Sequence, residues 1–175
     1  MPEAGLPVER GYRPGLIGAC IALHGLSYAA LSGFGASFEA RIAESLSEFA
    51  GRMQRPVNGL WSVHRGDTLL GTIAIDGEDL GPGKAHLRWF VVAAEARGSG
   101  IGRRLLEAAL GHCDASGFAA VHLWTFAGLD AACHLYETHG FALVDEKPGA
   151  QWGVAVIEQE YRRPHPRQGS VNPIS

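Results

Sequence analysis

The residues best suited to chemistry in this 175-residue chain are three glycines at alternate positions, Gly98, Gly100 and Gly102, in the stretch ARGSGIGRRLL. Glycine lets the backbone adopt positive φ and come close to a ligand, and the first turn of a helix offers unpaired N–H groups and a partial positive charge. Arg97 and Arg103 place cationic side chains at the two ends of the glycines. The stretch therefore predicts a cradle for an anion, with phosphate or pyrophosphate as the best match.

The apolar patterning around this stretch places it between a strand and a helix. The preceding residues 86–92, HLRWFVV, are rich in aromatic and β-branched side chains, which favour a strand. From Ile101 to Cys113 the apolar residues recur every three to four positions, as on one face of a helix, and Gly117 is placed to end that helix. The glycines therefore lie in a strand–turn–helix unit, with the anion cradle at the start of the helix.

Two common phosphate-binding loops do not fit these residues. A Walker loop ends in Gly-Lys-Ser/Thr, whereas Arg103, Arg104 and Leu105 follow Gly102 here. A Rossmann turn needs the spacing G-x-G-x-x-G and an acidic residue about 20 positions further on, at the end of the next strand. Position 103 is an arginine, and the next apolar run, AAVHLW, contains no carboxylate. The glycine stretch therefore belongs to another kind of phosphate-binding loop.

The rest of the chain predicts alternating helices and strands within one domain. We assign residues 1–9 to a short leader, residues 10–162 to the folded domain, and residues 163–175 to a disordered tail because of its prolines and weak apolar pattern. The order of elements predicts a mixed α/β or α+β sheet with helices packed on it. The predicted elements are helices over residues 16–26 and 38–49, two strands joined by a turn at Arg65-Gly66-Asp67, the strand–turn–helix unit, a strand over residues 118–126, a short helix over residues 130–138, and closing strands over residues 141–146 and 152–162.

Composition and charge exclude several classes of protein. A formal net charge of -3 supplies no general field that would attract nucleic acid, and no run approaches the roughly 20 apolar residues that span a membrane. The cysteines are odd in number and lack CxxC spacing, and His134 and His139 do not share one face of a helix. We therefore expect a cytoplasmic protein that binds neither nucleic acid nor membrane and holds no metal ion.

The glycine stretch, with the pattern Arg97-x-x-Gly100-x-Gly102, resembles the pyrophosphate loop of the GNAT family of acetyl-CoA-dependent N-acetyltransferases. The segment LRWFVVAAEARGSGIGRRLLEAAL is similar to the fourth strand, loop and third helix of that family, and HLYETHGFALV resembles its second signature. The stretches RPG, HGLSYA, FEA, LWT and WGVAVIEQEY further resemble the acetyltransferase half of proteins that fuse a MarR-type regulator to a GNAT domain. The resemblance implies a GNAT-like fold, with a mostly antiparallel, twisted central sheet, helices on both faces, and a splay between the fourth and fifth strands.

The resemblance implies acetyl-CoA as the cofactor and assigns it a place in the strand–turn–helix unit. In the family, the fourth strand leaves backbone groups free to pair with the pantetheine arm, and the amides of the glycine loop hold the pyrophosphate. A Cβ at Gly100 or Gly102 would intrude on the phosphate oxygens. Carried over position by position, the implied cofactor-binding residues are Phe90, Val91, Val92, Arg97, Gly98, Ser99, Gly100, Ile101, Gly102 and Arg103.

The resemblance also implies the groups that catalyse direct attack of an amine on the acetyl thioester. Tyr136 matches the position of the family's general acid, although a tyrosine beside Leu135 on an apolar helix face is also expected in a core. For the general base, His86 stands where several members carry a glutamate, and an ordinary histidine pKa near ~6.5 suits that role. An exposed surface histidine is the alternative for His86. His24 is a second candidate for the base, with a structural role as its alternative.

The implied activity is transfer of an acetyl group from acetyl-CoA to a primary amine of a small molecule or peptide, and the alternative is a non-catalytic acyl-CoA-binding sensor or interaction module. The sequence departs from the family pattern where Ala93-Ala94 replaces Asp-Pro and Leu129 replaces an asparagine. Ala30 and Leu31 stand where relatives carry acidic residues, which favours a small acceptor with an apolar body. The apolar stretch WGVAVI, taken as an exposed closing strand, predicts a monomer or a homodimer.

Overall fold

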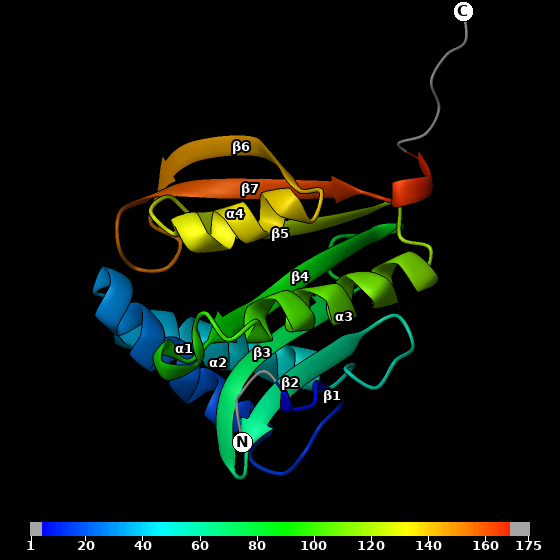
Figure 1. The fold of residues 1–175 in the computed structure, drawn as a ribbon. Helices are drawn as coiled ribbons and strands as arrows, with labels where there is room; N and C mark the ends of the chain where they lie inside the picture. The colour runs from blue at the N-terminus through cyan, green and yellow to red at the C-terminus, as the bar shows by residue number, and fades with distance from the viewer. Residues whose placement is uncertain (1–4, 169–175) are drawn as a thin grey trace, which may run out of the picture.

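A seven-stranded sheet with the strand order β1-β2-β3-β4-β5-β7-β6 forms the centre of the fold (Figure 1). The computed structural model describes residues 5–168. Within that range every neighbouring pair of strands is antiparallel except β4 and β5, which run parallel. The strands are β1 (Glu9–Arg10), β2 (Gly59–Arg65), β3 (Thr68–Asp76), β4 (Lys84–Val92), β5 (Ala120–Phe126), β6 (Ala142–Gly149) and β7 (Val156–Pro164).

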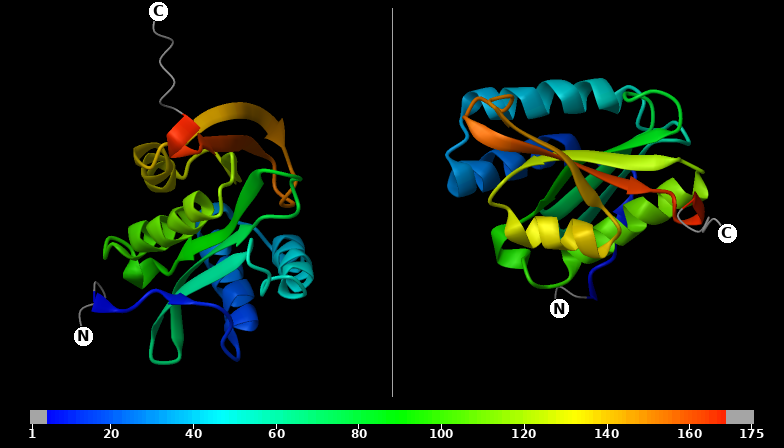
Figure 2. Two further views of the ribbon diagram at one scale, coloured as in Figure 1. Left: turned by 90° about the vertical axis from the view of Figure 1, so that its right-hand side faces the viewer. Right: turned by 90° about the horizontal axis from the view of Figure 1, so that it is seen from above.

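Helices cover both faces of this sheet, and Figure 2 shows α1 and α2 on one face and α3 and α4 on the other. Leu105 and Leu106, on the apolar stripe of α3, are completely buried against the sheet. On the opposite face, Leu46 and Phe49 of α2 are buried in a cluster with Trp89 of β4. The predicted mixed α/β fold with helices on both faces is confirmed. The helices are α1 (Leu16–Ser32), α2 (Ala36–Ala50), α3 (Ile101–Ala115) and α4 (Asp130–Thr138).

The closing region of the chain differs from the prediction. The stretch WGVAVI is not an exposed edge strand, because β7 begins only at Val156 and lies inside the sheet between β5 and β6. Trp152 instead packs its ring near those of Phe34 and Phe126, at centroid distances of 6.5 and 5.7 Å. Packing of this large, partly buried aromatic side chain takes precedence over the strand propensity of the apolar run. β7 therefore does not provide the exposed edge that the sequence predicted for a homodimer contact.

Both ends of the described chain pack more closely onto the domain than the sequence predicted. Leu6 and Val8, from the expected leader, pack against the main core. At the other end, β7 continues past the boundary predicted at residue 162, because the Arg163 guanidinium donates to both carboxylate oxygens of Asp114 in α3, at 2.7 and 2.9 Å. Residues 163 and 164 of the expected tail therefore belong to β7. The rest of the expected leader and tail, residues 1–4 and 169–175, lies outside the described range.

Strand β4 carries a bulge that separates it from β5, and the divergence of the two strands is visible in Figure 1. Trp89 has a φ of 47°, in the left-handed region that non-glycine residues rarely adopt. Thr72 Oγ1 of β3 donates to the Trp89 carbonyl oxygen at 2.8 Å, and the Trp89 ring packs near that of Phe49 at 5.1 Å. In the described chain, β4 pairs with β5 only over residues 84–86. The predicted splay between the fourth and fifth strands is confirmed.

A buried ion pair joins the end of α2 to the sheet close to this divergence. Asp76, the last residue of β3, has no exposed surface. Arg52, in the turn after α2, donates to it from Nη2 to Oδ2 at 2.6 Å and from Nε to Oδ1 at 3.3 Å. Arg88 Nη1 of β4 lies 3.7 Å from the same carboxylate. A buried carboxylate that loses its ion-pair partner still carries the cost of its removal from water. The pair between Arg52 and Asp76 therefore stabilises the junction between the end of α2 and the sheet.

Replacing Arg52 with methionine should lower the free energy of unfolding by about 2 to 3 kcal/mol, because the buried Asp76 carboxylate loses its closest cation and keeps only the more distant Arg88 and the Glu78 N–H, which donates to Oδ1 at 3.2 Å. Urea denaturation measures this loss. The matched control is Arg55→Met, which breaks an ion pair with Glu78 of the same 2.6 Å length at the surface. That variant should lose much less stability. Equal losses in the two variants would contradict the importance of the buried position.

Candidate active site between strands β4 and β5

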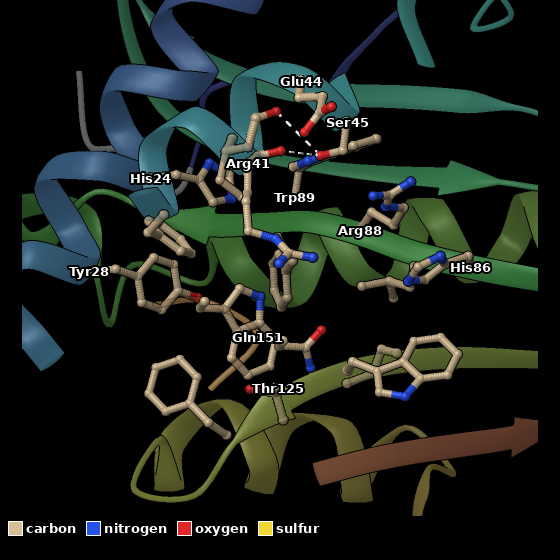
Figure 3. A pocket seen from close by; sticks show the side chains of 18 of the residues that line it. His24, Tyr28, Arg41, Glu44, Ser45, His86, Arg88, Trp89, Thr125 and Gln151 are labelled. Atoms are coloured by element: carbon tan, nitrogen blue, oxygen red, sulfur yellow. Dashed lines mark hydrogen bonds between the residues drawn. The ribbon is translucent and has the colours of Figure 1, made fainter. Parts of the chain in front are cut away.

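Two cavities meet where β4 and β5 diverge. One, of about 410 Å³, is lined by the end of β4, the glycine stretch and α4, and is called the glycine-loop cavity. The other, of about 350 Å³, is lined by α1, α2, β4, β5 and the segment before β7, and is called the α2 cavity (Figure 3). Because Tyr28, Phe90 and Tyr136 line both cavities, molecules bound on the two sides can meet there. Other lining residues include Val92, Arg97, Gly102 and Leu135 in the glycine-loop cavity, and His24, Arg41, His86 and Gln151 in the α2 cavity.

The glycine stretch has the backbone geometry that its residues predict. Gly98 and Gly100 have φ values of 76° and 83°, in the left-handed region that favours glycine. Gly100 directly precedes α3, and the first N–H of this helix to bond within it belongs to Arg104, at 3.1 Å from the Gly100 carbonyl oxygen. The N–H groups between these two residues have no helical partner. The start of α3 therefore presents free donors and a partial positive charge to an anion.

The glycine-loop cavity brings together much of the predicted cofactor site. Ile101, which was expected to contribute, is completely buried in the core, and Arg103 extends into solvent with an ion pair to Glu107 at 3.7 Å. In this geometry these two residues offer backbone N–H groups rather than side chains. The predicted residues that line the cavity are Phe90, Val91, Val92, Arg97, Gly98 and Gly102, and those outside its lining are Ser99, Gly100, Ile101 and Arg103.

Tyr136 of α4 lies at the junction of the two cavities. Its side chain is buried, and its ring packs near those of Phe90, Phe141 and Tyr161 at centroid distances of 6.0, 5.8 and 5.9 Å. Its hydroxyl has no hydrogen-bond partner among residues 5–168. Burial raises the pKa of Tyr136 well above its usual value, so the hydroxyl keeps its proton at neutral pH. The ring is thus part of the core, while the hydroxyl remains available for chemistry.

His86 is held by a carboxylate that the sequence analysis did not identify. Its Nδ1–H donates to Asp79 Oδ2 at 2.6 Å, which leaves Nε2 as an acceptor. The side chain is only 16% exposed, and its ring lies edge-on to that of Trp124 at 4.8 Å, so the alternative of an exposed surface histidine is wrong. Burial lowers the pKa of His86 below its usual value, and the Asp79 carboxylate opposes this fall. Such a pair orients an imidazole for proton uptake.

His24 of α1 also lines the α2 cavity, but its surroundings make it a weaker base. The side chain is buried, and its Nδ1–H donates to the Cys20 carbonyl oxygen at 2.8 Å, so Nε2 is the acceptor. Burial lowers the pKa of His24 to about 4, and the imidazole is therefore neutral at physiological pH. His24 can accept a hydrogen bond from a bound molecule, whereas His86 is better suited to take up a proton.

Eight of the side chains that line the α2 cavity are aromatic. Apart from Phe90 and Tyr136, the sequence analysis did not identify them as site residues, because they come from several elements that meet only in the fold. Ala30 and Leu31, which were expected to shape an apolar acceptor pocket, do not line this cavity, and Leu31 lines the glycine-loop cavity instead. The structure therefore places Leu31 beside the glycine loop rather than in the α2 cavity. The aromatic lining consists of Tyr28, Phe38, Trp89, Phe90, Trp124, Phe126, Tyr136 and Trp152, and labelled polar residues in Figure 3 include Arg41, Thr125 and Gln151.

Residues 5–168 include histidine, cysteine and acidic side chains, the types that bind metal ions. No three side chains of histidine, cysteine, aspartate or glutamate gather there as a metal site requires. Within the same range, no helix is both long and apolar enough to cross a membrane. Cys20, Cys113 and Cys133 are free thiols.

Comparisons with known proteins relate this chain to acetyltransferases. The model of the acetyltransferase (GNAT) family matches residues 28–141, which include the glycine stretch and Tyr136. The fold is similar to a ribosomal-protein-alanine N-acetyltransferase from Brucella melitensis (16% identity, 91% of this chain and 99% of that one, TM-score 0.70). It is also similar to an acetyltransferase from Streptococcus agalactiae, with 17% identity over 91% of this chain and 98% of that one and a TM-score of 0.73. A GCN5-related N-acetyltransferase from Kribbella flavida is similar too, with 23% identity over 94% of this chain and 99% of that one and a TM-score of 0.73. No curated protein matches the sequence significantly.

Proposed function

Because this chain belongs to the acetyltransferase (GNAT) family, we propose that it transfers an acetyl group from acetyl-CoA to a primary amine of a small molecule or peptide by direct attack. The observation that carries this proposal is the junction of the two cavities at Tyr136, whose protonated hydroxyl has no partner within residues 5–168. A cofactor in the glycine-loop cavity and an amine in the α2 cavity would meet at that hydroxyl.

The residues around the glycine-loop cavity fit the acetyl-CoA that the family generally uses. In the described chain, residues 87–92 of β4 do not pair with β5, so this edge offers backbone groups to the pantetheine arm as a partner strand would. A Cβ built on Gly100 meets no atom within 4 Å, which leaves room for a phosphate beside the free N–H groups of α3. The proposed cofactor-binding residues are Phe90, Val91, Val92, Arg97, Gly98, Ser99, Gly100, Ile101, Gly102 and Arg103.

Proton transfer is the chemistry that this chain's own side chains provide. Bound acetyl-CoA supplies a thioester whose carbonyl carbon a neutral amine attacks. The amine loses a proton as the C–N bond forms, and His86 Nε2 accepts it while Asp79 stabilises the resulting imidazolium. The sulfur gains a proton from the Tyr136 hydroxyl as the C–S bond breaks. His86 thus gains one proton and Tyr136 loses one, and exchange with solvent restores both groups.

Three further properties belong to the same proposal and rest on the sequence. The stretches HGLSYA and WGVAVIEQEY support a close relation to the acetyltransferase half of MarR–GNAT fusion proteins. Cysteines without a pairing pattern support a reducing, cytoplasmic location. We also propose that the protein acts on its acceptor without nucleic acid, which the net charge of -3 supports, and without membrane, as a monomer or homodimer, although β7 lies inside the sheet and gives no support to a dimer.

Gly100→Glu should abolish acetyl-CoA binding, because the new side chain fills the phosphate site and its negative charge repels the pyrophosphate. Isothermal titration calorimetry measures the affinity. The matched control is Gly66→Glu, in the β2–β3 turn, where the φ of +60° and the open space around the Cβ impose comparable backbone strain far from the cavity. The control should bind acetyl-CoA as the wild type does. Unchanged affinity in Gly100→Glu would show that the cofactor binds elsewhere.

Tyr136→Phe should lower kcat by about 10²-fold, the range typical for loss of a general acid, with little change in acetyl-CoA affinity. The free energy of unfolding should stay nearly constant, because the lost hydroxyl has no hydrogen-bond partner among residues 5–168. Release of free thiol from acetyl-CoA, measured over a panel of amines, gives the rate, and urea denaturation gives the stability.

The same assay includes Tyr12→Phe as a control, because Tyr12 is exposed and lines neither cavity. Full activity together with lowered stability in Tyr136→Phe would remove Tyr136 from the catalytic groups. Tight acetyl-CoA binding without thiol release for any amine would instead identify the alternative function, a non-catalytic acyl-CoA-binding module.

The pH dependence of kcat/KM should show an acidic limb at a pH below the ordinary histidine pKa, because burial lowers the pKa of His86 and the base must be neutral to act. Asp79→Asn should move this limb to still lower pH, because the carboxylate favours the protonated imidazole and its removal lowers the pKa further. The variant should also lower the plateau rate, because the imidazole loses its orientation.

His86→Gln should remove this acidic limb, while the separate limb from ionisation of the acceptor amine remains in every variant as an internal reference. An acidic limb that stays in place in both Asp79→Asn and His86→Gln would assign the base to another group, and His24, with a pKa of about 4, would be tested next.

A further inference from the structure

Arg41 places a cation in the α2 cavity without a counterion. Its side chain extends from α2 into the cavity, toward Gln151 in the view of Figure 3. Within residues 5–168 its guanidinium makes no hydrogen bond or ion pair. The other arginine that lines this cavity, Arg88, has Asp79 Oδ2 at 3.5 Å and Asp76 Oδ2 at 3.7 Å. Arg41 is therefore the cation of this cavity that is available to a bound molecule.

The acidic residues of the same helix leave Arg41 available. Glu44 follows Arg41 by three positions along α2, a spacing at which opposite charges commonly pair. No ion pair joins these two side chains in the described structure, and Figure 3 shows the Glu44 carboxylate beside the helix while Arg41 extends into the cavity. Glu48, further along α2, also lines the cavity and is exposed, as Arg41 and Glu44 are, and it makes no ion pair with Arg41 in the described structure. The guanidinium is thus directed at the cavity rather than at its own helix.

Besides Arg41, the charged residues that line the cavity are Arg88, which pairs with Asp76 and Asp79, and Glu44 and Glu48 of α2. Eight aromatic side chains line it as well, and His24 is neutral at physiological pH because burial lowers its pKa to about 4. Gln151 and Thr125 add neutral hydrogen-bonding groups. An acceptor that fits these walls has an apolar body and one anionic group at Arg41. The planar guanidinium fork matches a carboxylate in two parallel hydrogen bonds.

We infer that the acceptor is a small amine that also carries a carboxylate, with the carboxylate bound by Arg41, the apolar body against the aromatic wall, and the amino group directed at Tyr136. This inference rests on the proposed acetyl transfer and specifies its acceptor. The α2 cavity, of about 350 Å³, lies at the small end of ligand sites and suits a molecule of the size of one free amino acid. Arg41 acts as a specificity residue, because it contacts the part of the acceptor that does not react.

Matched pairs of acceptors test this inference. Each pair consists of an amino acid and the amine that lacks its carboxylate: phenylalanine and phenethylamine, tryptophan and tryptamine, leucine and isoamylamine. For each pair, the ratio of kcat/KM for the amino acid to kcat/KM for the amine is measured by thiol release in the wild type and in Arg41→Gln. Comparing the ratio between the two proteins cancels the difference in basicity within a pair.

The ratio should fall about ten- to a hundredfold in Arg41→Gln, as expected for the loss of a charge-assisted bidentate contact. The loss should appear mainly in KM for the amino acid. Arg41→Lys should retain part of the preference, because it keeps the charge without the fork. Glu44→Gln is the matched control on the same helix, and it should not lower the ratio.

The possible outcomes separate this inference from the proposed function. An unchanged ratio in Arg41→Gln, or turnover of the amines alone in every pair, overturns the inference and leaves acetyl transfer in place. Absence of thiol release with every acceptor contradicts acetyl transfer. Calorimetric titration of the same pairs into the wild type and Arg41→Gln, with coenzyme A present, then decides the inference. Binding of the amino acids that is stronger than that of the amines and depends on Arg41 supports it, and any other result overturns it.

Discussion

The bulge at Trp89 is the constraint on which the rest of the structure depends. A central strand that stays in register pairs with both neighbours along its length, and such a sheet has no passage through it. The φ of 47° at Trp89 costs of order 1 kcal/mol or more, and the hydrogen bond from Thr72 together with the packing of the ring near Phe49 offsets that cost. Because the bulge turns β4 away from β5, one edge of β4 stays free beyond residue 86, and the two cavities join at Tyr136.

The two faces of the sheet surround this opening with different chemistry. On the α3 and α4 face, backbone N–H groups and Arg97 present positive potential to an anion. On the α1 and α2 face, a chain of ion pairs runs from Arg52 through Asp76, Arg88 and Asp79 to His86. His86 is therefore oriented by the framework that joins α2 to the sheet, and its Nε2 is fixed as the acceptor.

Local sequence patterns predicted those parts of the molecule that depend on local geometry. The turn at Gly66, the positive φ of Gly98 and Gly100, and the start of α3 at Ile101 each follow from what neighbouring residues allow. The mixed α/β class followed from the order of the predicted elements, whereas the splay came from the resemblance to a family, because nothing in HLRWFVV marks Trp89 as a bulge. Asp79 was missed because only the β3–β4 loop brings it back beside His86. Contacts between distant segments, such as Arg163 with Asp114, likewise leave no periodic signal in the sequence.

A crystal structure of the protein with acetyl-CoA bound tests the central claim most directly, namely that the opening made by the bulge is where the cofactor meets the acceptor. The account predicts the pantetheine arm along residues 87–92 of β4, the pyrophosphate at the start of α3, and the thioester sulfur within about 4 Å of the Tyr136 hydroxyl, hydrogen-bonding distance for sulfur. A cofactor bound outside the glycine-loop cavity, or a thioester directed away from Tyr136 with the α2 cavity closed off from it, would contradict the account.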